Sequence, residues 1–254
     1  MSPSQFPQRC HVANEDLRPA GYYGQDVLDA VRQYWMDSYK SIRASSADTL
    51  QLIHDAFQPL SYWNDWEHPP HYAGVALDTH IYQMFSDGVS PFEARPKLVD
   101  HIGAHDMDPT WQGVAQTQSQ HIATACGQGP NLANFDKNQL WTIIGEWTPA
   151  MTDCAKYLNG RGVGARYDGT YTGSSRRVAS CKGKTGSGAS FSESYRTFLR
   201  QMWEAQVVSF EKASGWIMWT WKAEQADEWS YEAGLRYGWI PQDPTSLRYP
   251  HICG

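Results

Sequence analysis

Hydrophobic residues follow two patterns along this chain, one with helical spacing and one in short continuous runs. Residues 25–44 place Val31, Trp35 and Tyr39 four positions apart, so their side chains share one face of a predicted amphipathic helix. The continuous runs are shorter and predict strands. They cover residues 50–54, 74–82, 140–147 and 216–221. Two of the runs are apolar almost throughout, which is typical of strands buried on both faces of a parallel sheet.

The segments between these strands predict helices and one long loop. Helical segments are expected over about 92–126, with an interruption near Asp108-Pro109. Another helix runs from Ser190 or Ser192, either of which can cap it, to about Ala213. Residues 159–190 are polar and rich in glycine, which predicts a loop. Strands that alternate with helices favour an α/β fold, in which the chemistry sits at the carboxyl ends of the strands.

Composition narrows the classes of partner. The net charge is −6 and no dense Lys/Arg run occurs, which argues against a nucleic-acid partner. No stretch approaches the roughly 18 apolar residues of a membrane span, so no membrane partner is expected. The chain holds 12 Trp, 14 Tyr and 8 Phe, 13 % of its residues. Aromatic rings fill cores and stack on flat ligands, and the acidic charge favours a carbohydrate over nucleic-acid bases.

Polar groups follow the predicted strands directly. Glu146 comes after the apolar run 140–145 and is the best single candidate for carboxylate chemistry, the alternative being a structural glutamate paired with an arginine. His80 and Tyr82 alternate on one strand and therefore point the same way. They either face the same strand end as Glu146 or are a hydrogen-bonded core histidine and a packed tyrosine.

The tryptophans of the last predicted strand have two interpretations. Trp219 and Trp221 share one face of that strand, and Trp216 lies on the other. A shared face would suit stacking on a sugar, whereas most tryptophans in strands belong to the core.

Two motifs resemble sites for other ligands but are rejected. Gly183-Lys-Thr185 would end a phosphate-binding loop, yet Val178 stands where that loop requires glycine. His101 and His105 are four residues apart without an H-E-x-x-H pattern around them, so no metal site is predicted. No cofactor is expected.

Several long motifs make the chain resemble a known family, from about Pro19 to Cys253. They are the segments 53–57, 78–85, 145–148, 152–160 and 215–222, together with 228–230. The chain resembles the fungal exo-β-1,3-glucanases (glucan 1,3-β-glucosidases) of glycoside hydrolase family 5. The resemblance implies a (β/α)₈ TIM barrel and retaining hydrolysis by two glutamates, with β-1,3-glucan or an oligosaccharide as substrate.

The resemblance also assigns roles to residues. Glu146 matches the nucleophile, and His80 and Tyr82 match residues that line the sugar site and position it. Phe85 matches a ring at the pocket entrance, and Trp219 matches a stacking residue that precedes a non-proline cis peptide bond. Two further tryptophan assignments follow from position alone: Trp147 is expected at the glucose site, and Trp35, Trp141 and Trp216 are expected in the core.

The family's disulfides and location complete the expectation. The resemblance implies one disulfide between Cys126 and Cys253 and a second between Cys154 and Cys181. Cys10 is left without a partner in this scheme. The family is extracellular or bound to the cell wall, and the protein is expected to be a monomer. The N-terminus lacks the apolar region of a signal peptide.

The chain departs from the family pattern in its first part. Only about the last four βα units are found, so residues 1–18 are interpreted as a tail foreign to the family and 19–254 as the C-terminal half of an incomplete barrel. The family's Asn-Glu-Pro motif, which carries the acid/base glutamate, is missing before Pro19, and Glu15 is a weak substitute. The expectation is a truncated or wrongly assembled gene product with open sheet edges that is prone to aggregation. The alternative to an active glycosidase is a catalytically dead remnant that binds glucan weakly at most.

Overall fold

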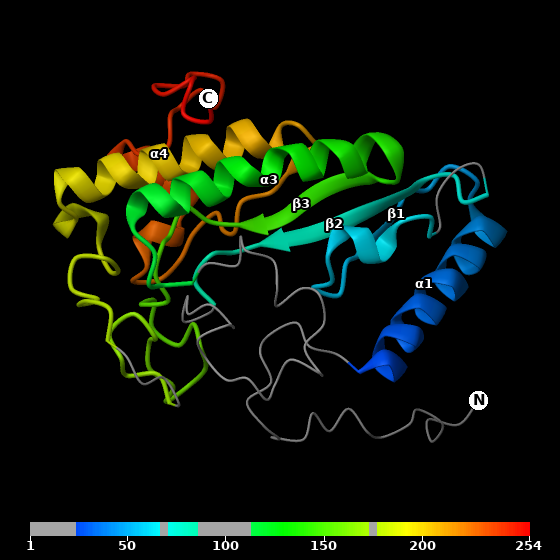
Figure 1. The fold of residues 1–254 in the computed structure, drawn as a ribbon, viewed down its shortest axis with the longest axis horizontal. Helices are drawn as coiled ribbons and strands as arrows, with labels where there is room; N and C mark the ends of the chain where they lie inside the picture. The colour runs from blue at the N-terminus through cyan, green and yellow to red at the C-terminus, as the bar shows by residue number, and fades with distance from the viewer. Residues whose placement is uncertain (1–23, 67–70, 86–112, 173–176) are drawn as a thin grey trace.

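The computed structural model describes residues 24–66, 71–85, 113–172 and 177–254. Within them, four strands form one parallel sheet in chain order (Figure 1). The strands are β1 (Gln51–His54), β2 (Val75–Ile81), β3 (Trp141–Trp147) and β4 (Gly215–Trp216). The predicted α/β fold with a parallel sheet is therefore confirmed. Among the described residues, β1 and β4 each have one strand neighbour.

The prediction of a strand through residue 221 is wrong. β4 ends at Trp216, although Ile217 N–H still donates to Ile144 O and Trp219 N–H to Trp147 O. After that point Thr220 N–H donates to Trp229 O instead of to the neighbouring strand. The chain thus leaves the sheet because its backbone pairs with the short 3₁₀ helix η5 (Asp227–Trp229).

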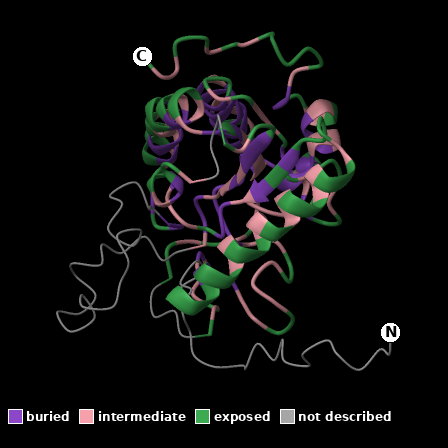
Figure 2. Cartoon of the chain, turned by 90° about the vertical axis from the view of Figure 1, so that its right-hand side faces the viewer, coloured by how far each residue is buried: buried purple, intermediate pink, exposed green. Residues whose placement is uncertain are grey.

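Four α-helices accompany the sheet in the ranges that the structure describes. They are α1 (Gln25–Ser45), α3 (Gln118–Asn138), α4 (Glu193–Phe210) and α5 (Tyr231–Tyr237). In Figure 1, α3 and α4 run side by side along one face of the sheet, and α1 lies at the β1 end. Helix α1 has Leu28 as its one fully buried residue, and Figure 2 shows that the rest of it is half-buried or exposed.

The helix boundaries revise one prediction and decide an alternative that the sequence left open. Part of the predicted helix 92–126 lies outside the described residues, and α3 begins after Thr117, whose side chain forms a capping box with Gln120. The helix continues through Pro130 because Leu132 and Phe135, which follow that proline, are buried in the core, and such packing outweighs weak local propensity. Ser192 rather than Ser190 caps α4, since its hydroxyl accepts the Tyr195 N–H at 3.2 Å.

The core between the sheet and helices α3 and α4 is largely aromatic. Trp147 is completely buried, with its ring 5.4 Å from Phe210 and 5.2 Å from Trp216. Its predicted place at a glucose site is therefore wrong. Trp141 was expected in the core, yet it is 63 % exposed at the start of β3. Trp35 and Trp216 are half-buried and pack against the core, as expected.

Two disulfides hold segments far apart in sequence. Cys126 of α3 pairs with Cys253 near the C-terminus, and Cys154 pairs with Cys181 across the long glycine-rich loop. This is the pairing that the family resemblance implies. Cys10 lies outside the described residues.

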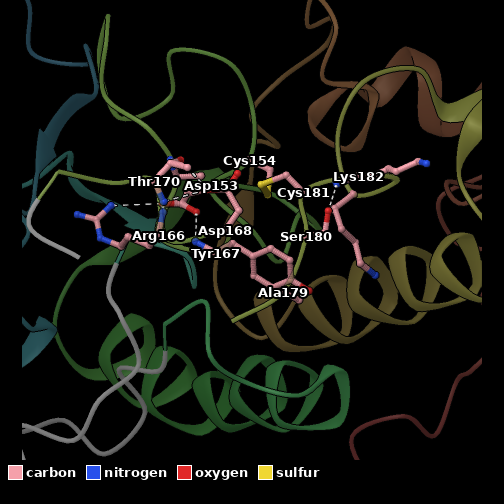
Figure 3. The surroundings of a disulfide bond; sticks show 12 residues. Asp153, Cys154, Arg166, Tyr167, Asp168, Thr170, Ala179, Ser180, Cys181 and Lys182 are labelled. Atoms are coloured by element: carbon pink, nitrogen blue, oxygen red, sulfur yellow. Dashed lines mark hydrogen bonds and ion pairs between the residues drawn. A yellow bond between two sulfur atoms is a disulfide. The ribbon is translucent and has the colours of Figure 1, made fainter. Parts of the chain in front are cut away.

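Asp153 organises the loop beside the second disulfide (Figure 3). Its carboxylate is buried and accepts the backbone N–H groups of Arg166 and Tyr167, at 2.7 and 3.0 Å, and the Asn159 side-chain amide at 2.9 Å. Arg166 Nη1 lies 3.5 Å from the same carboxylate. A buried charge with this many donors is well satisfied, so it can fix a loop that has no regular secondary structure.

Replacing both Cys154 and Cys181 by serine is expected to lower the free energy of unfolding by about 3 kcal/mol, because the bond closes a loop of this length in the unfolded chain. Chemical denaturation under oxidising conditions measures the loss. Wild type denatured in the presence of a reductant, which also opens the Cys126–Cys253 bond, gives the lower limit of stability. Equal stability of the double variant and the oxidised wild type would contradict the expectation.

No helix in the described ranges is long and apolar enough to cross a membrane.

Candidate active site

The carboxyl ends of β1, β2 and β3 bring the predicted polar residues together. In the sheet register Thr79 lies beside Ile144, but His80 lies beside Glu146, so one residue of β3 is passed over at this point. That residue is Gly145. A side chain there would overlap the Asp78 carboxylate. The absence of a Cβ atom therefore lets β2 and β3 approach at the strand ends, where His80 and Glu146 become neighbours.

Glu146 is held by a phenol and an imidazole. The Tyr82 hydroxyl donates a hydrogen bond to Glu146 Oε2 at 2.8 Å, and His80 Nδ1 lies 3.4 Å from the same oxygen. These partners, rather than an arginine, surround the carboxylate in the part of the chain that the structure describes. The pKa of the Tyr82 hydroxyl is raised, mainly because the group is buried and further because it bonds to the negatively charged Glu146. Tyr82 therefore stays protonated and remains a donor.

His80 lies between two carboxylates. Its Nε2 is 3.3 Å from Asp78 Oδ2, while its Nδ1 faces Glu146. Burial lowers the pKa of His80, but the Asp78 hydrogen bond and the negative charges of Asp78, Glu146 and Asp55 outweigh it, and the net pKa is raised. This arrangement favours the imidazolium form, because each ring nitrogen then donates toward an anion.

A second histidine, which the sequence interpretation missed, lies behind His80. The rings of His54 and His80 meet edge to face at 4.4 Å, and Phe57 contacts both. Burial and the His80 charge lower the pKa of His54. His54 Nδ1 also accepts the Ala56 N–H at 3.0 Å, which suits a neutral ring. Its position at the end of a predicted strand is the signal that could have identified it.

Asp55 is a buried carboxyl group next to this pair. It accepts the Thr79 hydroxyl at 2.5 Å and the Phe57 N–H at 2.8 Å. Burial raises its pKa to about 7, although both hydrogen bonds act in the opposite direction. Asp55 shapes the turn after β1 and keeps Phe57 close to His80.

Aromatic rings surround Tyr82, the donor to Glu146. Phe85 meets Tyr82 edge to face at 5.2 Å, and Trp229, which the sequence interpretation did not assign to a site, lies 5.8 Å from Tyr82. Trp219 is 50 % exposed, and a cis peptide bond joins it to Thr220. Its backbone pairs with Trp147, the residue after Glu146. A cavity of about 250 Å³ lies beside His54 and Phe57, between the end of β1 and α1.

These features define an α/β protein with a carboxylate-centred site at the carboxyl edge of a parallel sheet. In the described ranges, no group of three or more His, Cys, Asp or Glu side chains is arranged to hold a metal ion.

Comparison with known proteins identifies the relatives of this chain. It is 37 % identical over 248 residues to a glucan 1,3-β-glucosidase of Blumeria graminis, which covers 96 % of the chain and 51 % of the relative. It is 34 % identical over 233 residues to glucan 1,3-β-glucosidase 2 of Wickerhamomyces anomalus, and this match covers 89 % of the chain and 48 % of the relative. The glucan 1,3-β-glucosidase I/II of Saccharomyces cerevisiae is 32 % identical over 248 residues, and this match covers 96 % of the chain and 48 % of the relative.

The chain is thus similar to the C-terminal halves of fungal glucan 1,3-β-glucosidases, which confirms the resemblance found in the sequence. It spans about half the length of the curated relatives it matches. No family model matches the chain.

Proposed function

We propose that this chain carries the nucleophile side of a retaining exo-β-1,3-glucanase site built on a (β/α)₈ barrel. Glu146 is the nucleophile, and a β-1,3-glucan or oligosaccharide is the substrate. The observation that supports this most directly is the pair of groups at Glu146 Oε2, the Tyr82 hydroxyl at 2.8 Å and His80 Nδ1 at 3.4 Å. Both groups hold the oxygen of a carboxylate, the group that acts as nucleophile in this chemistry.

The chemistry proceeds by two displacements. Glu146 attacks the anomeric carbon while an acid/base carboxyl group protonates the leaving glycosidic oxygen, which gives a covalent glucosyl ester. Water then attacks that ester with the acid/base group as base, and glucose leaves with retained configuration. Two carboxyl groups and water are sufficient, so no cofactor is needed. Glu15, the weak substitute for the acid/base group, lies outside the described residues.

The aromatic residues suit the proposed substrate. Phe85 lies beside Tyr82, the donor to Glu146, and Trp219 has a half-exposed ring, and rings of this kind bind the apolar face of a glucose unit. The two disulfides agree with an extracellular or cell-wall location, since such bonds persist in oxidising compartments. A monomer is sufficient for the proposed site, because His80, Tyr82 and Glu146 come from one chain.

Labelling with dinitrophenyl 2-deoxy-2-fluoro-β-glucoside, together with glucose release from laminarin, tests the proposal. The dinitrophenolate leaves without protonation, so labelling requires the nucleophile but not the acid/base group. Peptide mass spectrometry then locates the label. Label on Glu146 with glucose release supports the active glycosidase. Label on Glu146 without glucose release identifies the dead remnant, whereas label on another residue, or no label and no glucose, overturns the assignment.

A further inference from the structure

Asp78 forms the far end of a chain of polar contacts that leads to Glu146. Its Oδ2 lies 3.3 Å from His80 Nε2, and the opposite nitrogen of the same imidazole lies 3.4 Å from Glu146 Oε2. The imidazole is therefore clamped between two carboxylates that come from neighbouring strands. A ring held at both nitrogens has its orientation and its protonation state set by both partners.

The fold makes room for this contact at a structural cost. Gly145 is the β3 residue passed over in the register, and any side chain there would overlap the Asp78 carboxylate. Asp78 Oδ1 is buried and, within the described part of the chain, lacks a hydrogen-bond partner. A buried carboxylate oxygen without a donor disfavours folding, so stability alone does not explain an aspartate here.

We propose that Asp78 is a positioning residue that acts through His80 to hold the Glu146 carboxylate directed at the anomeric carbon. The inference rests on the proposed function of Glu146, since it states how the nucleophile is prepared. In this scheme Asp78 touches neither the substrate nor Glu146. It holds the proton on His80 Nε2, which leaves the Nδ1 proton directed at Glu146 Oε2.

The other groups around His80 cannot substitute for Asp78. His54 packs edge to face on the imidazole, but neither form of a histidine carries a negative charge, so it cannot replace the Asp78 carboxylate. Asp55 is already occupied by Thr79 and Phe57, and its raised pKa of about 7 weakens its negative charge near neutrality. Removing the Asp78 charge therefore leaves Glu146 as the principal anion facing His80, with Tyr82 as a neutral neighbour.

Asp78→Asn tests the proposal, because asparagine keeps the size and one acceptor oxygen but loses the charge. Asp37→Asn, an exposed aspartate on α1, is the matched control. NMR titration is expected to show a wild-type His80 pKa above 6.5 and a fall of at least one unit, a tenfold weaker proton affinity, in Asp78→Asn only. This readout does not require activity, so it decides the inference even if the proposed function fails.

The rate of fluoro-glucoside labelling supplies the functional readout. It is expected to fall at least tenfold in Asp78→Asn at pH 7 and to recover toward wild type at lower pH, where His80 becomes protonated again. A purely structural role would lower the rate equally at every pH. An unchanged His80 pKa in folded Asp78→Asn, or a wild-type value below 6.5, would overturn the proposal.

A second variant protects the test against misfolding. Gly145→Ala displaces the Asp78 carboxylate without altering any charge, and Gly127→Ala, which meets nothing within 4 Å, is its control. Gly145→Ala is expected to reproduce the fall in the His80 pKa. An unaltered His80 pKa in a folded Gly145→Ala protein would count against the inference.

Discussion

Replacing Glu146 by glutamine is expected to slow both fluoro-glucoside labelling and glucose release by at least about a thousandfold, or roughly 4 kcal/mol of transition-state stabilisation. Glutamine has the same shape, and its carbonyl oxygen can still accept the Tyr82 hydroxyl that now lies 2.8 Å from Oε2. It cannot form the glucosyl ester. The fold should therefore survive while the chemistry is lost. Initial rates against dinitrophenyl β-glucoside measure the effect.

The control for this change is Glu193→Gln, an exposed carboxylate in the first turn of α4. Its activity should match the wild type. A smaller variant, Glu146→Ala, should regain activity with added azide and yield the α-configured glucosyl azide, because azide then occupies the face from which the carboxylate attacks. Glu146→Gln with wild-type rates, or azide product of β configuration, would place the nucleophile elsewhere.

The sequence could predict which residues stand at the strand ends, because that requires only the lengths of the apolar runs. His80, Tyr82 and Glu146 were identified in this way, and the structure brings them within hydrogen-bonding distance or close to it. His54 ends its own strand similarly and was overlooked. Asp78 was visible at the same strand end, two residues before His80, but the pairing of His80 with Glu146 depends on the register shift beside Gly145. No local pattern encodes that shift.

The burial of the two tryptophans of β3 also depends on this register shift, which the sequence pattern does not encode. Trp141 and Trp147 are six residues apart, so strict alternation would place both on one face of the strand. The register shift between them separates their faces, and Trp141 is 63 % exposed while Trp147 is fully buried. The strand predicted over 216–221 failed for a related reason. Its second half bonds to Trp229, a partner that only the tertiary fold supplies.

The second large effect concerns Glu228, which makes the stability of the protein depend on pH. Its side chain is completely buried beside the equally buried Tyr195. Burial raises its pKa from 4.5 to about 8, with the Thr185 hydroxyl offsetting only part of the shift. The folded state therefore binds a proton that the unfolded state releases between these two values. The resulting stabilisation is complete below pH 4.5 and is lost as the pH rises to about 8.

Glu228→Gln is expected to remove this dependence. A shift of this size corresponds to a loss on the order of 5 kcal/mol across the interval, so glutamine should leave stability at pH 5 little changed and raise it at pH 8. Urea denaturation from pH 4.5 to 8 measures the slopes. Glu232→Gln, a half-buried glutamate paired with Arg236, is the control. Asp55 contributes a similar dependence up to about pH 7, so Asp55→Asn is compared in parallel.

The position of Glu228 connects this pH dependence to the candidate active site. The next residue, Trp229, contacts the Tyr82 ring and accepts the Thr220 N–H. It therefore supports Tyr82, the donor to Glu146, and the segment that carries Trp219. Ionisation of Glu228 should weaken these contacts of Trp229 before the whole protein unfolds. We therefore expect the labelling rate at Glu146 to fall above pH 8 in wild type and to persist there in Glu228→Gln. Parallel pH profiles of the two proteins would show that Glu228 does not support the site.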